Sequence, residues 1–233
     1  MKIWNQSSRD KNSGIDDFLS SEDIVLDQEL FLYDIEASIA HTHELEKINI
    51  FTKTEARKVI SSLKKLGKFF QTNKFKLTAK YEDCHSAIED FLTKELGSIG
   101  KKIHTGRSRN DQIIVAMRLY AREKLDEIQS INLKVAKAFL EKSEKHSGNP
   151  MPGYTHLQRA VPSSWGLWFG AFAESFLDNA ELLSNTKSWI NVNPLGTAAG
   201  YGVNLPIKRD ISTKELNFKR KQLNSLYVQN SRG

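Results

Sequence analysis

Apolar residues recur at three- and four-residue steps along most of the chain, the spacing typical of amphipathic helices. The clearest stripe follows Thr52-Lys53-Thr54-Glu55, which has the spacing of a helix-capping box. It consists of Ala56, Val59, Ile60, Leu63, Leu66 and Phe70. Similar patterns predict helices at 26–40 and 87–96, the second ended by Gly97. We therefore expect a small helical domain over residues 1–103, with a loose start up to about Ser20.

A longer pattern covers residues 113–146, without Pro or Gly until Gly148. Its seven-residue repeat is formed by Ile114, Ala121, Ile128 and Val135. Pro150 and Pro152 interrupt the pattern, and Pro162 opens a second segment that is apolar over much of its circumference. Helices this long and this apolar pack in bundles. We expect an all-α fold in which residues 104–233 form part of a central helical bundle.

Composition indicates an ordinary globular protein, with 39% hydrophobic and 27% charged residues. No stretch is apolar enough to span a bilayer, and the N-terminus lacks a signal-peptide core, so we expect a cytoplasmic protein. Cys84 is the one cysteine, which excludes an internal disulfide. His41 and His43 do not share a helix face, and we expect no metal site.

The net charge of +6 raises the question of nucleic-acid binding. Most of that charge belongs to residues 208–233, and no aromatic stacking platform accompanies it there. A solvated helix face is therefore the favoured interpretation, and nucleic-acid binding is a minor hypothesis. The glycine-rich segment Asn193–Gly202 lacks the glycine spacing and the strand-turn-helix context of a dinucleotide loop. We interpret it as a tight connection between helices.

Two polar runs are candidates for chemistry. His104–Gln112 combines two arginines with hydroxyls, an amide and Gly106, which suits a dicarboxylate or a phosphate, although a solvated loop would have the same composition. Gly153–Gln158 contains His156, whose imidazole can exchange protons near neutrality. A loop histidine on its own is more often structural or exposed than catalytic.

The two runs resemble the first two sequence blocks of the argininosuccinate lyase family, within the aspartase/fumarase superfamily. The resemblance extends from Lys2 to Arg232. The first run is specific to that family, whereas Thr-His-Leu-Gln is shared more widely in the superfamily. The resemblance implies an all-α, cofactor-free enzyme of arginine biosynthesis that splits argininosuccinate into arginine and fumarate. It also implies a homotetramer whose active sites combine three blocks from three subunits.

The resemblance assigns roles to individual residues. His156 falls in the acid/base position, and Gln158 would orient the ligand or the loop. The stabilisation of the carbanion, an aci-carboxylate, would come from Ser108, Arg109, Asn110 and Thr155. Contacts with substrate or its neighbours are expected from Asp83, His85 and Asp27. An equally weighted alternative makes Asp83 a helix N-cap and His85 a helix-surface residue.

The chain also departs from the family pattern. The substrate-binding serine near the N-terminus falls on Asp23, unless an insertion moves Ser20 or Ser21 into its place. The third block, Gly-Ser-Ser-x-Met-Pro, does not occur in the sequence, and a helical stripe that begins at Leu216 stops by Gly233. We therefore interpret the chain as the N-terminal portion of a lyase. Two alternatives stay open: a non-catalytic fragment or partner subunit, and a sister lyase with another fumarate-releasing substrate.

Overall fold

The computed structural model describes residues 13–231, with side chains from Glu22 onward except that of Asp23. The ends of the family resemblance, Lys2 and Arg232, and most of the predicted loose start lie outside the described residues. Within them, a helix already begins at Ser13.

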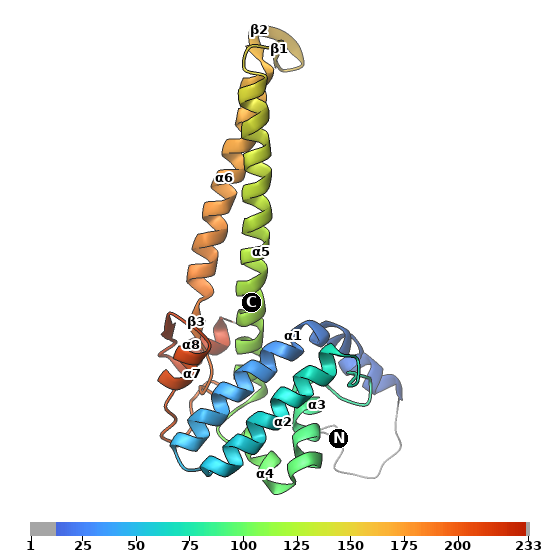
Figure 1. The fold of residues 1–233 in the computed structure, drawn as a ribbon, viewed down its shortest axis with the longest axis vertical. Coiled ribbons are helices and arrows are strands. Elements are labelled where there is room, and N and C mark those ends of the chain that lie inside the picture. Colours follow the sequence, from blue (N-terminus) through green and yellow to red (C-terminus); the bar gives the residue numbers. More distant parts are fainter. Residues whose placement is uncertain (1–12, 232–233) are drawn as a thin grey trace. The chain divides into compact units, whose positions relative to one another are not determined.

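The described residues are mostly helical (Figure 1). The helices are α1 (Ser13–Lys47), α2 (Lys53–Gln71), α3 (Cys84–Leu96), α4 (Ser98–Lys101), the 3₁₀ turn η1 (Lys102–His104), α5 (Arg109–Lys145), α6 (Trp165–Ile190), α7 (Asp210–Glu215) and α8 (Ser225–Asn230). The strands are β1 (Pro150–Thr155), β2 (Gln158–Ser164), β3 (Val192–Asn193) and β4 (Arg220–Lys221). β1 and β2 pair antiparallel, and β3 and β4 pair parallel. The prediction of a helical protein is confirmed.

The chain divides into two compact units. Unit 1 combines residues 1–120 with residues 191–233, and unit 2 is formed by residues 121–190. Unit 1 is thus built from two separate stretches of chain. The predicted domain boundary at residue 103 lies within the first of these stretches and stays a prediction.

The main core of unit 1 lies among α1, α2 and α3, which are neighbours in Figure 1. The predicted stripe on α2 is its centre: Ala56, Val59, Leu63 and Leu66 are fully buried. The predicted helix end is confirmed at Gly97, which follows α3 with φ of 61°. The sequence pattern therefore located the core-forming face of this part of the chain.

A second core cluster joins the two stretches of unit 1. It combines residues of α1 and α5 with residues that follow α6: Ala37, Ala40, Val115, Leu119, Leu195, Leu216 and Phe218. The predicted helical stripe from Leu216 is wrong at its start. α7 has ended by then, Asn217 adopts φ of 54°, a left-handed conformation typical of helix ends, and a helix returns only at Ser225.

The capping box of α2 allows a direct test of local stability. The Thr52 side chain accepts a hydrogen bond from the backbone N–H of Glu55, and the Glu55 side chain accepts one from the backbone N–H of Thr52. We expect Thr52→Ala to lower the free energy of unfolding by about 1 kcal/mol, because a helix donor loses its partner. Urea unfolding followed by circular dichroism measures it. Thr54→Ala, inside the same helix turn, is the control, and equal effects from the two variants would contradict the assignment.

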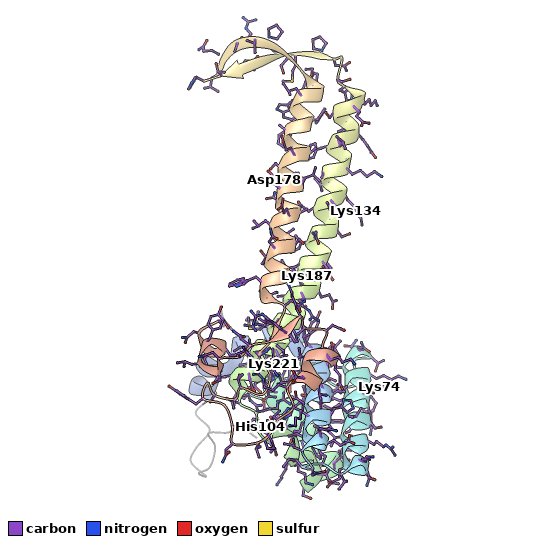
Figure 2. The ribbon with its side chains drawn as sticks, turned by 90° about the vertical axis from the view of Figure 1, so that its left-hand side faces the viewer. Lys74, His104, Lys134, Asp178, Lys187 and Lys221 are labelled. Carbon is purple, nitrogen blue, oxygen red and sulfur yellow. The ribbon has the colours of Figure 1, made fainter. Side chains whose placement is uncertain are left out.

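Unit 2 consists of α5 from Ala121 onward, the β1–β2 hairpin and α6. The two helix segments lie side by side in both views, and the ring of Phe139 contacts three rings of α6, those of Phe169, Phe172 and Phe176 (Figures 1 and 2). Polar contacts accompany the rings: the Asn132 amide donates to the Phe176 carbonyl, at 2.7 Å. Figure 2 shows Lys134 and Asp178 on these helices.

The apolar faces of unit 2 are only partly covered within the chain. Leu167, Leu182 and Trp189 on α6 are 71%, 64% and 69% exposed. The predicted apolar circumference of α6 is therefore confirmed. The two helices of unit 2 cannot bury it by themselves. Across the described residues, no helix combines the length and apolar character that crossing a membrane requires.

Candidate active site

The first polar run connects η1 to α5. His104 ends η1 (labelled in Figure 2), and Arg109 is the first residue of α5. Gly106 lies between them with φ of 72°, and a β-carbon there would approach the Ile207 Cδ1 atom to 2.7 Å. Glycine adopts this left-handed backbone without strain and leaves room for the Ile207 side chain. Gly106 thus shapes the turn that brings the run to the start of α5.

Arg109 is held by two carboxylates. Its Nη1 donates to the Oε1 of Glu89 at 2.7 Å and to the Oε1 of Gln112 at 2.9 Å, and its Nε lies 3.1 Å from the Oδ2 of Asp83. Burial alone would lower the pKa of Arg109, but Glu89 and Asp83 raise it. The guanidinium is therefore permanently charged and fixed in orientation.

Glu89 links Arg109 to the beginning of the run. Its Oε1 lies 3.0 Å from the Nδ1 of His104 as well as 2.7 Å from the Nη1 of Arg109. Burial opposes ionisation, yet the hydrogen bond from His104 and the charge of Arg109 lower the pKa of Glu89 to about 2. Glu89 is a carboxylate that the sequence analysis missed. The sequence did contain a signal for Glu89: it lies one helical turn after His85 and therefore on the same face of α3.

A second ionic group lies deeper in unit 1. The Oδ2 of Asp34 lies 2.7 Å from the Nδ1 of His85, and its Oδ1 accepts from the Nη2 of Arg107 at 3.2 Å. All three side chains are at most 1% exposed. Burial alone would raise the pKa of Asp34, but His85 and Arg107 hold it at about 2. The same carboxylate outweighs burial at His85 and raises the pKa of that imidazole.

The start of α3 gathers the remaining predicted residues of unit 1. Asp83 caps the helix, because its Oδ1 accepts from the backbone N–H of Ser86 at 2.6 Å. Asp27 accepts from the backbone N–H of Cys84 at 2.8 Å, and burial raises its pKa. The capping alternative for Asp83 is confirmed. The alternative that placed His85 on the helix surface is wrong, since His85 is fully buried against Asp34.

Asp34, Cys84 and His85 form a group that metal ions could in principle use, because their ligand atoms lie within 4.8 Å of one another. Two features disfavour a cation there. Arg107 already donates to Asp34, and burial raises the pKa of the Cys84 thiol well above its usual value, so that the thiolate ligand is suppressed. The donor set fits a buried ionic network better than a metal.

Ser108 and Asn110 flank Arg109 at the start of α5. The Ser108 hydroxyl accepts from the backbone N–H of Asn110 at 3.3 Å, and the Ser108 backbone N–H donates to the Oδ1 of Asp111 at 2.8 Å. The three predicted residues 108–110 therefore occupy consecutive positions on one well-anchored turn. Asp23, Ser20 and Ser21 lie within α1, and their side chains are outside the described part of the structure.

The second polar run lies in unit 2. Thr155 ends β1, Gln158 begins β2 and pairs with Thr155, and His156 and Leu157 form the two-residue turn between them. His156 and Leu157 have φ of 47° and 66°, a backbone conformation that is costly for residues other than glycine. All four residues are exposed, and Leu157 is 94% exposed. The hairpin, which the sequence analysis did not predict, thus presents His156 to solvent.

The structure therefore gathers the predicted residues in two groups. Unit 1 holds Asp27, Asp83, His85, Ser108, Arg109 and Asn110, together with the unpredicted partners Asp34, Glu89 and Arg107. Unit 2 holds Thr155, His156 and Gln158. The first group is a charge-compensated polar cluster, and the second is an exposed turn with an imidazole.

Comparison with known proteins identifies the group to which these features belong. The sequence model of a family described as "Lyase" matches residues 7–231. The chain belongs to this lyase family. Curated relatives in the family include the argininosuccinate lyase of Xanthomonas euvesicatoria, 47% identical over 231 residues, which are 99% of this chain and 54% of that protein. The argininosuccinate lyase of Xylella fastidiosa is also 47% identical, over 99% of this chain and 52% of that protein.

Solved structures of lyases show the same fold. A variant of EDDS lyase with bound fumarate is 27% identical, with a TM-score of 0.78 over 87% of this chain and 40% of that one. A protein described as fumarate lyase:delta crystallin from Brucella melitensis is 17% identical, with a TM-score of 0.73 over 87% of this chain and 49% of that one. The chain spans about half the length of the curated relatives that it matches.

Proposed function

We propose that this chain is the N-terminal portion of an argininosuccinate lyase, which splits argininosuccinate into arginine and fumarate. The observation that carries the proposal is the 47% identity to argininosuccinate lyases over 99% of the chain. The specific run His104–Gln112 and the exposed His156 support it. The predicted division into residues 1–103 and 104–233 belongs to this proposal, with the second part contributing to a helical bundle.

The proposed chemistry is an elimination. A proton leaves the carbon next to a carboxylate, and the guanidinium nitrogen is expelled, so that negative charge accumulates on an already ionised carboxylate. Fixed donors aimed at that group stabilise it. Arg109, with Ser108, Asn110 and Thr155, is suited to this task because Glu89 and Asp83 already fix its orientation. His156 would move the proton, with Gln158 orienting the ligand or the loop.

The acidic side of the unit 1 cluster suits the cationic part of the same substrate. Asp27 and Asp83 lie beside the start of α3, and a guanidinium or ammonium group pairs well with carboxylates. His85 is fully buried, so it would contact the neighbours of the substrate rather than the substrate itself. The reaction requires no cofactor or metal, and we place the enzyme in the cytoplasm.

Oligomerisation is part of the proposal. The exposed apolar side chains of α6 and the exposed turn at His156 are features expected of subunits that complete one another's sites in a homotetramer. The third block of the family would come from residues outside this sequence. The proposed ligands are therefore small molecules, argininosuccinate and its products.

A substrate panel tests the proposed activity. The intact polypeptide carrying this sequence is purified from its source and assayed in parallel with argininosuccinate, adenylosuccinate, aspartate and malate. The release of fumarate is followed by ultraviolet absorbance. We expect turnover to be fastest with argininosuccinate. Preference for another substrate would favour a sister lyase with that substrate. The likeness to EDDS lyase supports this alternative.

A second candidate function is that of a non-catalytic fragment or partner subunit, because the Gly-Ser-Ser-x-Met-Pro block does not occur within the printed residues. The mass of the native polypeptide separates the two. A mass well above 26.5 kDa supports the complete enzyme. A mass of 26.5 kDa, together with co-purification of a longer lyase subunit, supports the partner role.

A further inference from the structure

In the glycine-rich segment Asn193–Gly202, two backbone N–H groups converge on one carboxylate oxygen. Gly196 and Ala198 have φ of 83° and 50°. Their backbone N–H groups both donate to the Oδ2 of Asp111, each at 3.0 Å. Alternating left-handed residues that aim N–H groups at one point form an anion-binding nest. Here the nest is occupied by a carboxylate of the protein itself.

The nest is held in shape by contacts that do not involve Asp111. Arg209 donates from Nε to the Leu195 carbonyl at 2.7 Å and from Nη2 to the Asn193 carbonyl at 3.1 Å. The side chain of Asn193 accepts from the Leu195 backbone N–H at 2.9 Å, and the Thr197 hydroxyl donates to the Pro194 carbonyl at 2.9 Å. The loop is thus preorganised, and it should keep its geometry when the carboxylate is removed.

The other oxygen of Asp111 fixes the first polar run. Its Oδ1 accepts from the backbone N–H of Ser108 at 2.8 Å, directly before Arg109. Asp111 is fully buried, and three backbone N–H groups donate to its two carboxylate oxygens. One carboxylate therefore joins the start of α5 to the loop that follows α6.

We propose that Asp111 is a positioning residue that sets Ser108, Arg109 and Asn110 through this nest, and that the nest, once vacated, binds a small carboxylate ion. Truncation of Asp111 to alanine removes a group the size of formate. It leaves the Gly196 and Ala198 N–H groups in a polar cavity that matches that ion. The effect on catalysis rests on the proposed function, whereas the binding of formate does not.

Thermal unfolding of Asp111→Ala in increasing sodium formate tests the binding. We expect a lower Tm than for the unsubstituted chain, followed by a saturable rise with formate, because an ion that binds only the folded state stabilises it by mass action. Sodium chloride at equal ionic strength should not reproduce the rise. If the variant does not fold without the ion, helical circular dichroism is measured after refolding with and without formate. Failure of formate to restore folding, or no saturable rise in Tm, would overturn the proposal.

Asp111→Asn is the matched control. Its amide fills the nest and turns an NH₂ group toward backbone donors, so it should lower Tm without any response to formate. Asp126→Ala removes an exposed acid that pairs with Lys187 in unit 2, and it should also give no response. A formate response in either control would show that the ion acts elsewhere.

Turnover in the intact polypeptide tests positioning. Below the Tm of the variant, we expect Asp111→Ala to lower kcat/KM by about 10²-fold, the scale of an ångström-level misplacement, and formate to recover most of it. Asp111→Asn should lose activity without recovery, and the unsubstituted enzyme in formate measures competition at the substrate site. Formate binding without recovery would overturn the positioning role. An unsubstituted enzyme inactive on argininosuccinate would instead defeat the proposed function and leave the nest intact.

Discussion

His156→Asn in the intact polypeptide is expected to lower kcat for argininosuccinate by about 10²–10⁴-fold, with a small change in KM. This is the usual contribution of a side chain that transfers a proton in the transition state, and asparagine cannot transfer one. Asparagine is the suitable replacement because it tolerates the left-handed backbone that His156 adopts, with φ of 47°. Steady-state kinetics with fumarate detection measures the effect.

Two further variants isolate the imidazole. His43→Ala removes a half-exposed histidine that pairs with Glu215 in unit 1, and it should leave kcat unchanged. Leu157→Ala changes the neighbouring turn residue without removing a titratable group, so it reports the cost of disturbing the turn. Undiminished kcat in His156→Asn, or an equal loss in Leu157→Ala, would remove His156 from the proposed acid/base role.

Asp34→Asn is expected to lower the free energy of unfolding of unit 1 by about 3–5 kcal/mol, since it leaves His85 and Arg107 buried without their counter-charge. Hydrogen exchange by mass spectrometry during urea unfolding measures it. Peptides from α1 and α3 should lose protection, whereas peptides from α6, in unit 2, should not. Asp210→Asn, which breaks an exposed pair with Lys221, should have little effect.

The loss in Asp34→Asn should be larger below the ordinary pKa of histidine, about 6.5, than above the raised pKa of His85. Asp34 raises the pKa of His85 above the ordinary value, about 6.5, so protonation of His85 stabilises the native protein below that pH and this contribution is lost as pH rises through the raised pKa. The pKa of Asp34 is about 2, and its contribution is lost only as pH falls below about 4 toward 2. An equal loss in these two pH ranges would contradict the coupling between Asp34 and the protonation of His85.

The sequence predicted those parts of the fold that depend on local pattern. The α2 stripe, the capping box at Thr52 and the end of α3 at Gly97 follow from residues a few positions apart, and the structure contains all three. The hairpin was missed because its tip, His156-Leu157, lacks the Asn-Gly or Gly residues that signal a tight turn. Its strands also contain three prolines, which favour neither a strand nor a helix.

The candidate site was predictable where a motif was continuous in sequence. The consecutive residues Ser108, Arg109 and Asn110 were found in this way. Asp34 and Asp111 were not, because their partners lie 51 and 85 residues away along the chain and depend on tertiary packing. Asp34 did have a local signal: it lies on the buried face of α1, three residues after Phe31, where an acid requires a partner.

The second core cluster constrains synthesis on the ribosome. Leu119 has been translated long before Phe218, its partner in that cluster, which follows about a hundred residues later. At typical elongation rates this interval lasts roughly 5–20 s. During it, the apolar side chains of Ala37, Val115 and Leu119 have no covering surface from the chain's own later part. A nascent polypeptide paused within α6 should therefore recruit holdase chaperones, and release should coincide with emergence of the residues after α7.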